Sequence, residues 1–165
     1  MTASMFQVRA AEVVDAEVMV SVHYASVHGI DERHYSHAVL NAWSPEPDAK
    51  RIAWMRNVIG AGRVAALVVA RGDSIAGFCL CAAEQGRIDA LYVDPMHAGT
   101  GAGRALLRAC ERAIVDRGVL TARVLASLNA VGFYVAGGYA QRGDALQPLS
   151  DGSLLACVDM SRVLR

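Results

Sequence analysis

Hydrophobic and polar positions follow two different periods along this chain, and the changes of period mark its elements. Runs rich in apolar and β-branched residues predict strands at 6–9, 64–70, 74–83, 87–93 and 121–126. Amphipathic spacing predicts helices at 15–29, 34–43, 48–59, 102–117 and 129–136. Arg71-Gly72-Asp73 and Asp151-Gly152 predict turns, the second between two final strands. The pattern predicts one α/β (α+β) domain over residues 1–165, with a mixed but largely antiparallel sheet flanked by helices.

Two of these helices have predicted faces. Asp15 stands where an N-cap is expected, and the following helix has one apolar side made of Val18, Met19, Val22 and Ala25. The second helix should end before Ser44-Pro45, because proline disfavours helical geometry in the preceding residue. In 102–117, an apolar stripe of Leu106, Cys110 and Ile114 lies opposite a solvated stripe of Arg104, Arg108 and Arg112.

The composition indicates a globular protein. Of 165 residues, 54% are hydrophobic and 19% charged, and 16 basic residues balance 16 acidic ones. A net charge of zero argues against a broad nucleic-acid interface. The segment from Met1 to Phe6 lacks the features of a signal peptide, and the longest apolar run, 64–70, is too short to span a bilayer. We therefore expect a cytoplasmic protein without a nucleic-acid or membrane partner.

The four cysteines suggest packing rather than chemistry. Cys79, Cys81, Cys110 and Cys157 form no C-x-x-C pair and have no histidine at zinc-finger spacing. We expect buried thiols in a reducing compartment and no metal site.

The segment from Leu91 to Leu107 has the strongest functional pattern. A strand ends at Pro95, glycines follow at 99, 101 and 103, and an amphipathic helix begins. Free amide groups at the positive end of a helix suit a phosphate. A Walker loop is excluded, because Gly103 is followed by Arg104 and Ala105 rather than by Lys and Ser or Thr. The glycine spacing also disfavours a dinucleotide fingerprint, and with it a nucleotide-dependent enzyme.

Two motifs carry a resemblance to a known family. Val93-Asp94-Pro95 with Gly101 and Gly103 is followed, about 25 residues on, by Asn129-Ala130 and Phe133-Tyr134 ahead of Gly138-Tyr139. These segments resemble the GNAT superfamily of N-acetyltransferases, and weaker similarities extend over nearly the whole chain. One position departs from the family pattern, since Ala98 stands where Gln or Arg is usual. We expect weakened rather than abolished cofactor binding, with His97 or Arg104 as substitute donors.

The resemblance implies a V-splayed sheet that admits acetyl-CoA as co-substrate, without a metal. The implied cofactor-binding groups are the backbone at the strand end, the glycine loop, Asn129 and Tyr134. The residues concerned are Leu91, Tyr92, Val93, Ala98, Gly99, Thr100, Gly101, Ala102, Gly103, Arg104, Asn129 and Tyr134. Asn129 could also, or only, cap the helix that follows it. Tyr134 is also the implied general acid for the coenzyme A thiolate, because phenol and thiol pKa values ordinarily lie within about 2 units of each other.

The sequence does not decide which residue is the general base or which residues form the acceptor pocket. Asp89 is a candidate base, since strand alternation would place it on one face with Leu91 and Val93. Its rivals are Glu84, a water relay and the histidines His23, His28, His34, His37 and His97. Tyr35, His37 and Trp43 could line an acceptor pocket that suits a cationic amine, or could be ordinary surface and core residues.

The expected activity is acetyl transfer from acetyl-CoA to a primary amine of a small molecule or peptide, by direct attack in a ternary complex. The alternative is a non-catalytic acyl-CoA-binding or regulatory module on the same fold, which Ala98 favours and Tyr134 opposes. The acceptor itself is not indicated. The resemblance also allows a homodimer, the form of many relatives.

Overall fold

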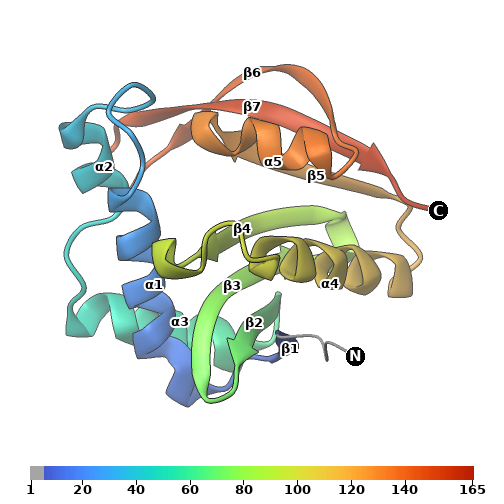
Figure 1. Cartoon of the computed structure of the whole chain (residues 1–165), viewed down its shortest axis with the longest axis horizontal. Helices are drawn as coiled ribbons and strands as arrows, with labels where there is room; N and C mark the ends of the chain where they lie inside the picture. The colour runs from blue at the N-terminus through green and yellow to red at the C-terminus, as the bar shows by residue number, and fades with distance from the viewer. Residues whose placement is uncertain (1–5) are drawn as a thin grey trace.

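A seven-stranded sheet forms the centre of the computed structural model, which describes residues 6–165 (Figure 1). The strands are β1 (Gln7–Ala10), β2 (Ala65–Arg71), β3 (Ser74–Ala82), β4 (Arg87–Val93), β5 (Thr121–Ser127), β6 (Ala140–Pro148) and β7 (Leu154–Val163). Their order is β1-β2-β3-β4-β5-β7-β6, and of these seven strands only β4 and β5 pair in parallel. The predicted mixed, largely antiparallel sheet is confirmed.

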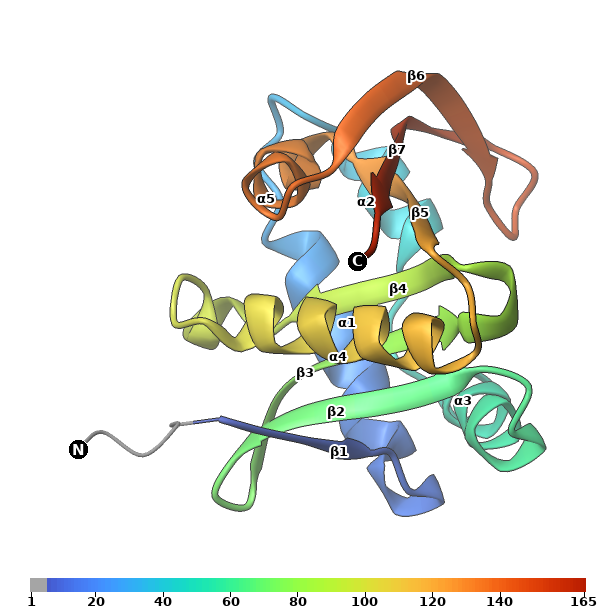
Figure 2. The ribbon, with the colours of Figure 1, turned by 90° about the vertical axis from the view of Figure 1, so that its right-hand side faces the viewer.

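Among residues 6–165, five α-helices flank the sheet: α1 (Ala16–His28), α2 (His37–Trp43), α3 (Ala49–Ala61), α4 (Ala102–Asp116) and α5 (Val131–Ala136). Figure 2 shows α4 running along the strands of the N-terminal part of the sheet, with α1 on the opposite face. The apolar stripe of α4 is confirmed, because Leu106, Cys110 and Ile114 are completely buried. These side chains share one core with Tyr134 of α5, whereas α1 and α3 enclose a second core on the other face.

The sheet opens between its two parallel strands. β4 and β5 pair only at Arg87 with Arg123 and at Ile88 with Val124. Beyond these pairs β4 stays in register with β3 as far as Val93, and β5 stays in register with β7 as far as Ser127. The two halves therefore diverge towards the end at which α4 begins (Figure 1), which confirms the V-splayed sheet.

Two details of α1 differ from the prediction. Val18 is 42% exposed, and the buried positions are Ala16, Met19, Val20, Val22 and Val27, because the helix packs against both β3 and α3. Asp15 does precede the helix, but its carboxylate accepts from the Glu12 amide at 2.7 Å and from Arg9 at 2.7 Å instead of capping. It closes the 3-10 turn Val13–Asp15 that leads into α1.

The second helix begins later than predicted. Ser36 caps it by accepting from the Val39 amide at 3.3 Å, so α2 starts at His37 rather than at His34. Its end at Trp43, ahead of Ser44-Pro45, is as predicted.

All four cysteines are free and buried, as the sequence predicts. Within residues 6–165, no group of three or more His, Cys, Asp or Glu side chains is arranged to hold a metal ion. Over the same residues, no helix combines the length and apolarity that crossing a bilayer requires. The segment 1–5, which the signal-peptide argument used, lies outside the described residues.

Candidate functional site

A cleft occupies the opening between β4 and β5. Its walls come from β4, from β5 and the turn after it, from β7 with Gln147 of β6, and from Trp43 at the end of α2. It brings together five of the predicted site residues, namely Trp43, Asp89, Leu91, Tyr92 and Tyr134. Because β4 and β5 do not pair here, their backbone groups face the cleft without strand partners across it.

The glycine loop lies where β4 leads into α4. Asp94 caps the 3-10 turn Pro95–His97 by accepting from the Met96 amide at 2.9 Å. Gly99 and Gly101 then take positive φ angles of 72° and 95°, which residues with a Cβ rarely adopt. In the part of the chain that the structure describes, the amides from Gly99 to Arg104 have no acceptor. The start of α4 therefore presents a row of free donors at its positive end.

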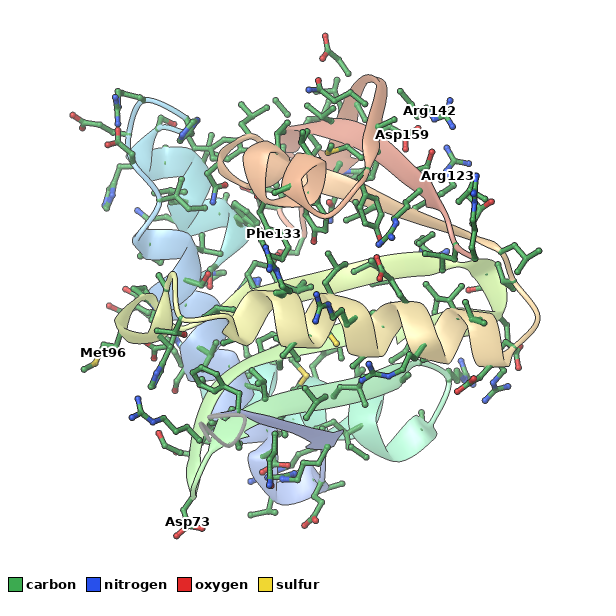
Figure 3. All side chains as sticks on the ribbon, turned by 45° about the vertical axis from the view of Figure 1, so that its right-hand side comes forward. Asp73, Met96, Arg123, Phe133, Arg142 and Asp159 are labelled. Carbon is green, nitrogen blue, oxygen red and sulfur yellow. The ribbon has the colours of Figure 1, made fainter. Side chains whose placement is uncertain are left out.

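Gly103 meets a different requirement, namely close packing. A Cβ at this position would lie 3.2 Å from Cε2 of Phe133 and 3.6 Å from Cγ2 of Val93. Figure 3 shows Phe133 beneath α5, directed towards the first turns of α4. The glycine thus lets α5 approach the loop, and this places the two sequence motifs side by side. Met96 projects outward at the edge of the same loop and is 88% exposed (Figure 3).

Ala98, the departure from the family pattern, is exposed in this loop. Of the two substitute donors, His97 packs its ring edge-on to Phe6, with 6.1 Å between ring centres. Arg104 lies in the first turn of α4, is exposed, and forms no ion pair with any described residue. The geometry therefore favours Arg104 as the free cationic group beside the amides.

Tyr134 is buried between the two motifs but its hydroxyl reaches the cleft. The residue is 4% exposed, and its ring packs edge-on to Tyr139 at 5.5 Å. Its hydroxyl makes no hydrogen bond to residues 6–165, although no fully buried polar side-chain atom there lacks a partner. The hydroxyl is therefore open to a ligand.

Burial raises the pKa of Tyr134 far above its ordinary value, and the neighbouring Cys110 acts in the same direction. The near match between phenol and thiol pKa values that the sequence argument assumed does not hold for this buried phenol. Tyr134 is consequently a protonated donor at all physiological pH values, and a weak acid.

Asn129 lies in the 3-10 turn Leu128–Ala130 at the entrance of α5, and it is exposed. The suggestion that it caps the helix is wrong, because α5 has no side-chain cap. The amide group is left available at the surface.

Asp89 lines the cleft at a point where the strand alternation used in the prediction is interrupted. Leu80 pairs with Ala90 and Cys81 pairs with Ile88, so Asp89 is the extra residue of a β-bulge. Leu91 packs into the α4 core, whereas Ala90, next to Asp89, packs into the α1 and α3 core. Ile88 and Leu91 both pack into the α4 core although they are three residues apart, so the bulge breaks the alternation from which a face shared with Leu91 and Val93 was predicted for Asp89.

The Asp89 carboxylate is also engaged. Arg87 donates to one of its oxygens from Nε, and to the other from Nη2 at 3.3 Å. Its predicted rival Glu84 is exposed and pairs with Arg117 at 2.7 Å, away from the cleft lining.

The three predicted acceptor residues separate in the structure. Tyr35 is 6% exposed, and its hydroxyl donates to the Ala156 carbonyl at 2.6 Å and accepts from the Leu128 amide at 2.8 Å. His37 is exposed at the start of α2 and does not line the cleft. Trp43 does line it, 6.2 Å from the Tyr92 ring. Of these three residues, the structure brings only Trp43 to the cleft.

Sequence reasoning missed two groups of residues. Gln147, Ser127 and Cys157 line the cleft, but nothing local in the sequence distinguishes them. His23, which the sequence gave only as one of five candidate histidines, packs edge-on to Tyr92 with 4.4 Å between ring centres. None of the five histidines lines the cleft.

Comparison with known proteins agrees with this geometry. The family model described as "Acetyltransferase (GNAT) domain" matches residues 33–152. No curated protein matches the sequence. Among solved structures, a protein described as a GCN5-related N-acetyltransferase (aminotransferase, class II) from Rhodopseudomonas palustris is 27% identical over 99% of both chains, with a TM-score of 0.88.

Two more distant structures share the fold. A GNAT superfamily phosphinothricin acetyltransferase from Sinorhizobium meliloti, solved with acetyl-CoA, is 17% identical over 98% of this chain and 89% of its own, with a TM-score of 0.71. The paia N-acetyltransferase from Thermoplasma acidophilum, solved with coenzyme A, is 18% identical over 96% and 98%, with a TM-score of 0.68. The splayed sheet, the glycine loop and the family match lead to one conclusion: the chain belongs to the GNAT family of acetyltransferases.

Proposed function

We propose that this chain, as a single domain over residues 1–165, transfers an acetyl group from acetyl-CoA to a primary amine of a small molecule or peptide. One observation carries the proposal. A row of amides at the start of α4 that bond to none of residues 6–165 lies at the open end of a cleft, and the buried ring of Tyr134 presents its hydroxyl, which is not hydrogen-bonded to these residues either, to that cleft. The relatives solved with acetyl-CoA and coenzyme A support the choice of donor.

The loop fits a diphosphate. The amides of Gly99 to Arg104 would donate to it, and the exposed Arg104 guanidinium would add a charged donor. The acyl arm would then lie along the side of β4 that faces away from β3, where backbone groups of the segment Leu91 to Val93 have no strand partner in β5 and can supply hydrogen bonds. A backbone donor that points at the thioester oxygen would stabilise the charge that develops there by about 3 kcal/mol.

Tyr134 would donate a hydrogen bond to the sulfur as the thiolate leaves. Because burial raises the pKa of this phenol, the proton is held until negative charge appears next to it. Complete proton transfer is then coupled to departure of the thiol rather than preceding it.

The amine must lose a proton before or during attack. Asp89 is the only carboxylate among the described residues that line the cleft, and we assign it the role of proton acceptor. Its pairing with Arg87 requires the amine to compete for one oxygen, or to pass its proton through a bridging water. The face of Trp43 would hold an ammonium group at the acceptor side.

Calorimetric titration with acetyl-CoA, followed by thiol release with a panel of amines, tests the proposal. The panel contains amino acids, polyamines, aminoglycosides and peptides with free N-termini, and mass spectrometry identifies the acetylated product. We expect binding and at least one acetylated amine. Binding without turnover for any amine would favour the non-catalytic module, and absence of binding would refute both.

A further inference from the structure

Three polar side chains from different elements meet next to Trp43 and Tyr92, the two aromatic residues that we call the acceptor wall of the cleft. His23 comes from α1, Ser44 directly follows α2, and Arg51 lies in the first turn of α3. Nδ1 of His23 is 2.8 Å from Oγ of Ser44, and Nη2 of Arg51 is 3.2 Å from both atoms. Ser44 is completely buried. Residues up to 28 positions apart in the sequence thus form one hydrogen-bonded triangle.

The direction of these bonds follows from the chemistry of arginine. A guanidinium group only donates, so Nδ1 of His23 must accept, and the imidazole proton resides on Nε2. The Ser44 hydroxyl accepts from Arg51 and donates to His23. All three groups are therefore satisfied only while His23 is neutral.

The same groups fasten the chain on either side of Ser44. Nη1 of Arg51 donates to the carbonyl of Pro45, and Nε2 of His28 lies 2.8 Å from the carbonyl of Ser44. The segment directly after α2 is thus held to α1 and α3 by three side chains. Arg51 forms no ion pair with any residue from 6 to 165, and the nearby Asp48 caps the Arg51 amide at 2.8 Å. The fixed fork of the guanidinium therefore serves to hold carbonyl and hydroxyl groups.

The residue before this anchored segment is Trp43. Its ring lies 6.2 Å from Tyr92 and 6.4 Å from His23, and the His23 ring lies 4.4 Å from Tyr92. Trp43 and Tyr92 both line the cleft, whereas His23, Ser44 and Arg51 do not. The triangle can therefore act on a bound acceptor only through the position of these two rings.

We propose that Arg51, Ser44 and His23 are positioning residues for acceptor recognition, because they hold the indole of Trp43 against Tyr92 and so fix the acceptor wall of the cleft. The inference rests on the proposed function, in which this wall receives the amine. It assigns acceptor selectivity to residues that never touch the acceptor.

The test uses Trp43 as its own reporter. Trp54, the other tryptophan, is 58% exposed on α3, so Trp54→Phe leaves a single indole to observe. In this background, Ser44→Ala and Arg51→Met are compared with Arg56→Met, a control at an exposed arginine on the same helix. Acrylamide quenching of Trp43, the KM for the acceptor and the KM for acetyl-CoA are measured for each, with the thermal midpoint as a check of folding.

We expect Ser44→Ala and Arg51→Met to increase quenching of Trp43 and to raise the acceptor KM about fivefold, the factor that one hydrogen bond is worth. The KM for acetyl-CoA should change less than about twofold, and Arg51→Lys should restore part of the loss because lysine still donates. Arg56→Met should show the same quenching of Trp43 and the same two KM values as the parent. Should Arg51→Met fail to fold, Ser44→Ala decides, since it removes one hydroxyl and keeps the packing.

Unchanged quenching and unchanged acceptor KM in Ser44→Ala would overturn the inference. The outcome is separable from failure of the proposed function. A parent protein that acetylates no amine removes the kinetic readout, but quenching of Trp43 still reports whether the triangle positions the ring.

Discussion

The hydroxyl of Tyr35 donates a 2.6 Å hydrogen bond to the carbonyl of Ala156, 121 residues further along the chain. It also accepts from the amide of Leu128, which opens the 3-10 turn leading to α5. Ser127 and Cys157, the neighbours of these two groups, form the last pair of the β5–β7 ladder. Tyr35 thus takes the place of one further rung and fixes the turn that carries Asn129.

Replacing Tyr35 with Phe should therefore destabilise the fold. The change leaves the Leu128 amide and the Ala156 carbonyl without their partner, and we expect a loss of about 1–3 kcal/mol in the free energy of unfolding. Urea unfolding measures it. Tyr24→Phe is the matched control, because the Tyr24 ring packs on His28 and its hydroxyl bonds to none of residues 6–165. Equal stability of the two variants would contradict the assigned role.

Tyr134→Phe should separate catalysis from binding. The ring that packs in the α4 core stays, while the hydroxyl open to the cleft is lost. Loss of a positioned proton donor lowers turnover about 100-fold, and the dissociation constant for acetyl-CoA should stay close to that of the parent. Tyr139→Phe serves as control, because that hydroxyl donates to Glu111 at 3.0 Å and Tyr139 does not line the cleft. Turnover of Tyr134→Phe equal to that of the control would remove the residue from its role.

Gly101→Ala and Gly103→Ala should each weaken acetyl-CoA binding, for different reasons. At Gly101 the φ of 95° would strain an alanine by about 1–3 kcal/mol. At Gly103 the new methyl group would push against Phe133 and shift α5 relative to the loop. Gly60→Ala is the matched control, since Gly60 lies within α3 with open space around it. Calorimetric affinities that are the same for all three variants would refute the loop assignment.

The free energy of unfolding should depend on pH through His23. Burial, with help from Arg51 and His28, lowers the pKa of His23 from 6.5 to about 4. The unfolded chain therefore takes up a proton at a higher pH than the folded protein does. Stability is at its full value above pH 6.5 and is lost as the pH falls to about 4, by roughly 3 kcal/mol.

Urea unfolding between pH 7 and pH 4 measures this slope. In His23→Gln, which removes the titrating group, the slope over this range should flatten. His37→Gln, at an exposed histidine on α2, should keep the slope of the parent. A parent-like slope in His23→Gln would show that other groups control the acid sensitivity.

Much of the fold and of the glycine loop could be predicted from the sequence, because both depend on local features. Period-two and helical spacing located the strands and helices to within a few residues, as in α3, where Asp48 and Gly62 mark the ends. The glycine loop could be predicted for the same reason, because its positive φ angles favour glycine and Pro95 ends the preceding strand. The buried stripe of α4 also follows from short-range spacing, whereas the motif around Tyr134 was identified by its resemblance to the family.

Tertiary structure alone decided the rest of the site. A bulge, visible only once β3 is paired with β4, interrupts the simple alternation on which the predicted face of Asp89 depended. Tyr35 became a structural residue through partners 93 and 121 positions away. Likewise, the hydrogen bond of His23 with Arg51 depends on the packing of α3 against α1, which the sequence does not show. Local periodicity encodes which way a residue faces within its own element, whereas the partner it meets depends on how distant elements pack.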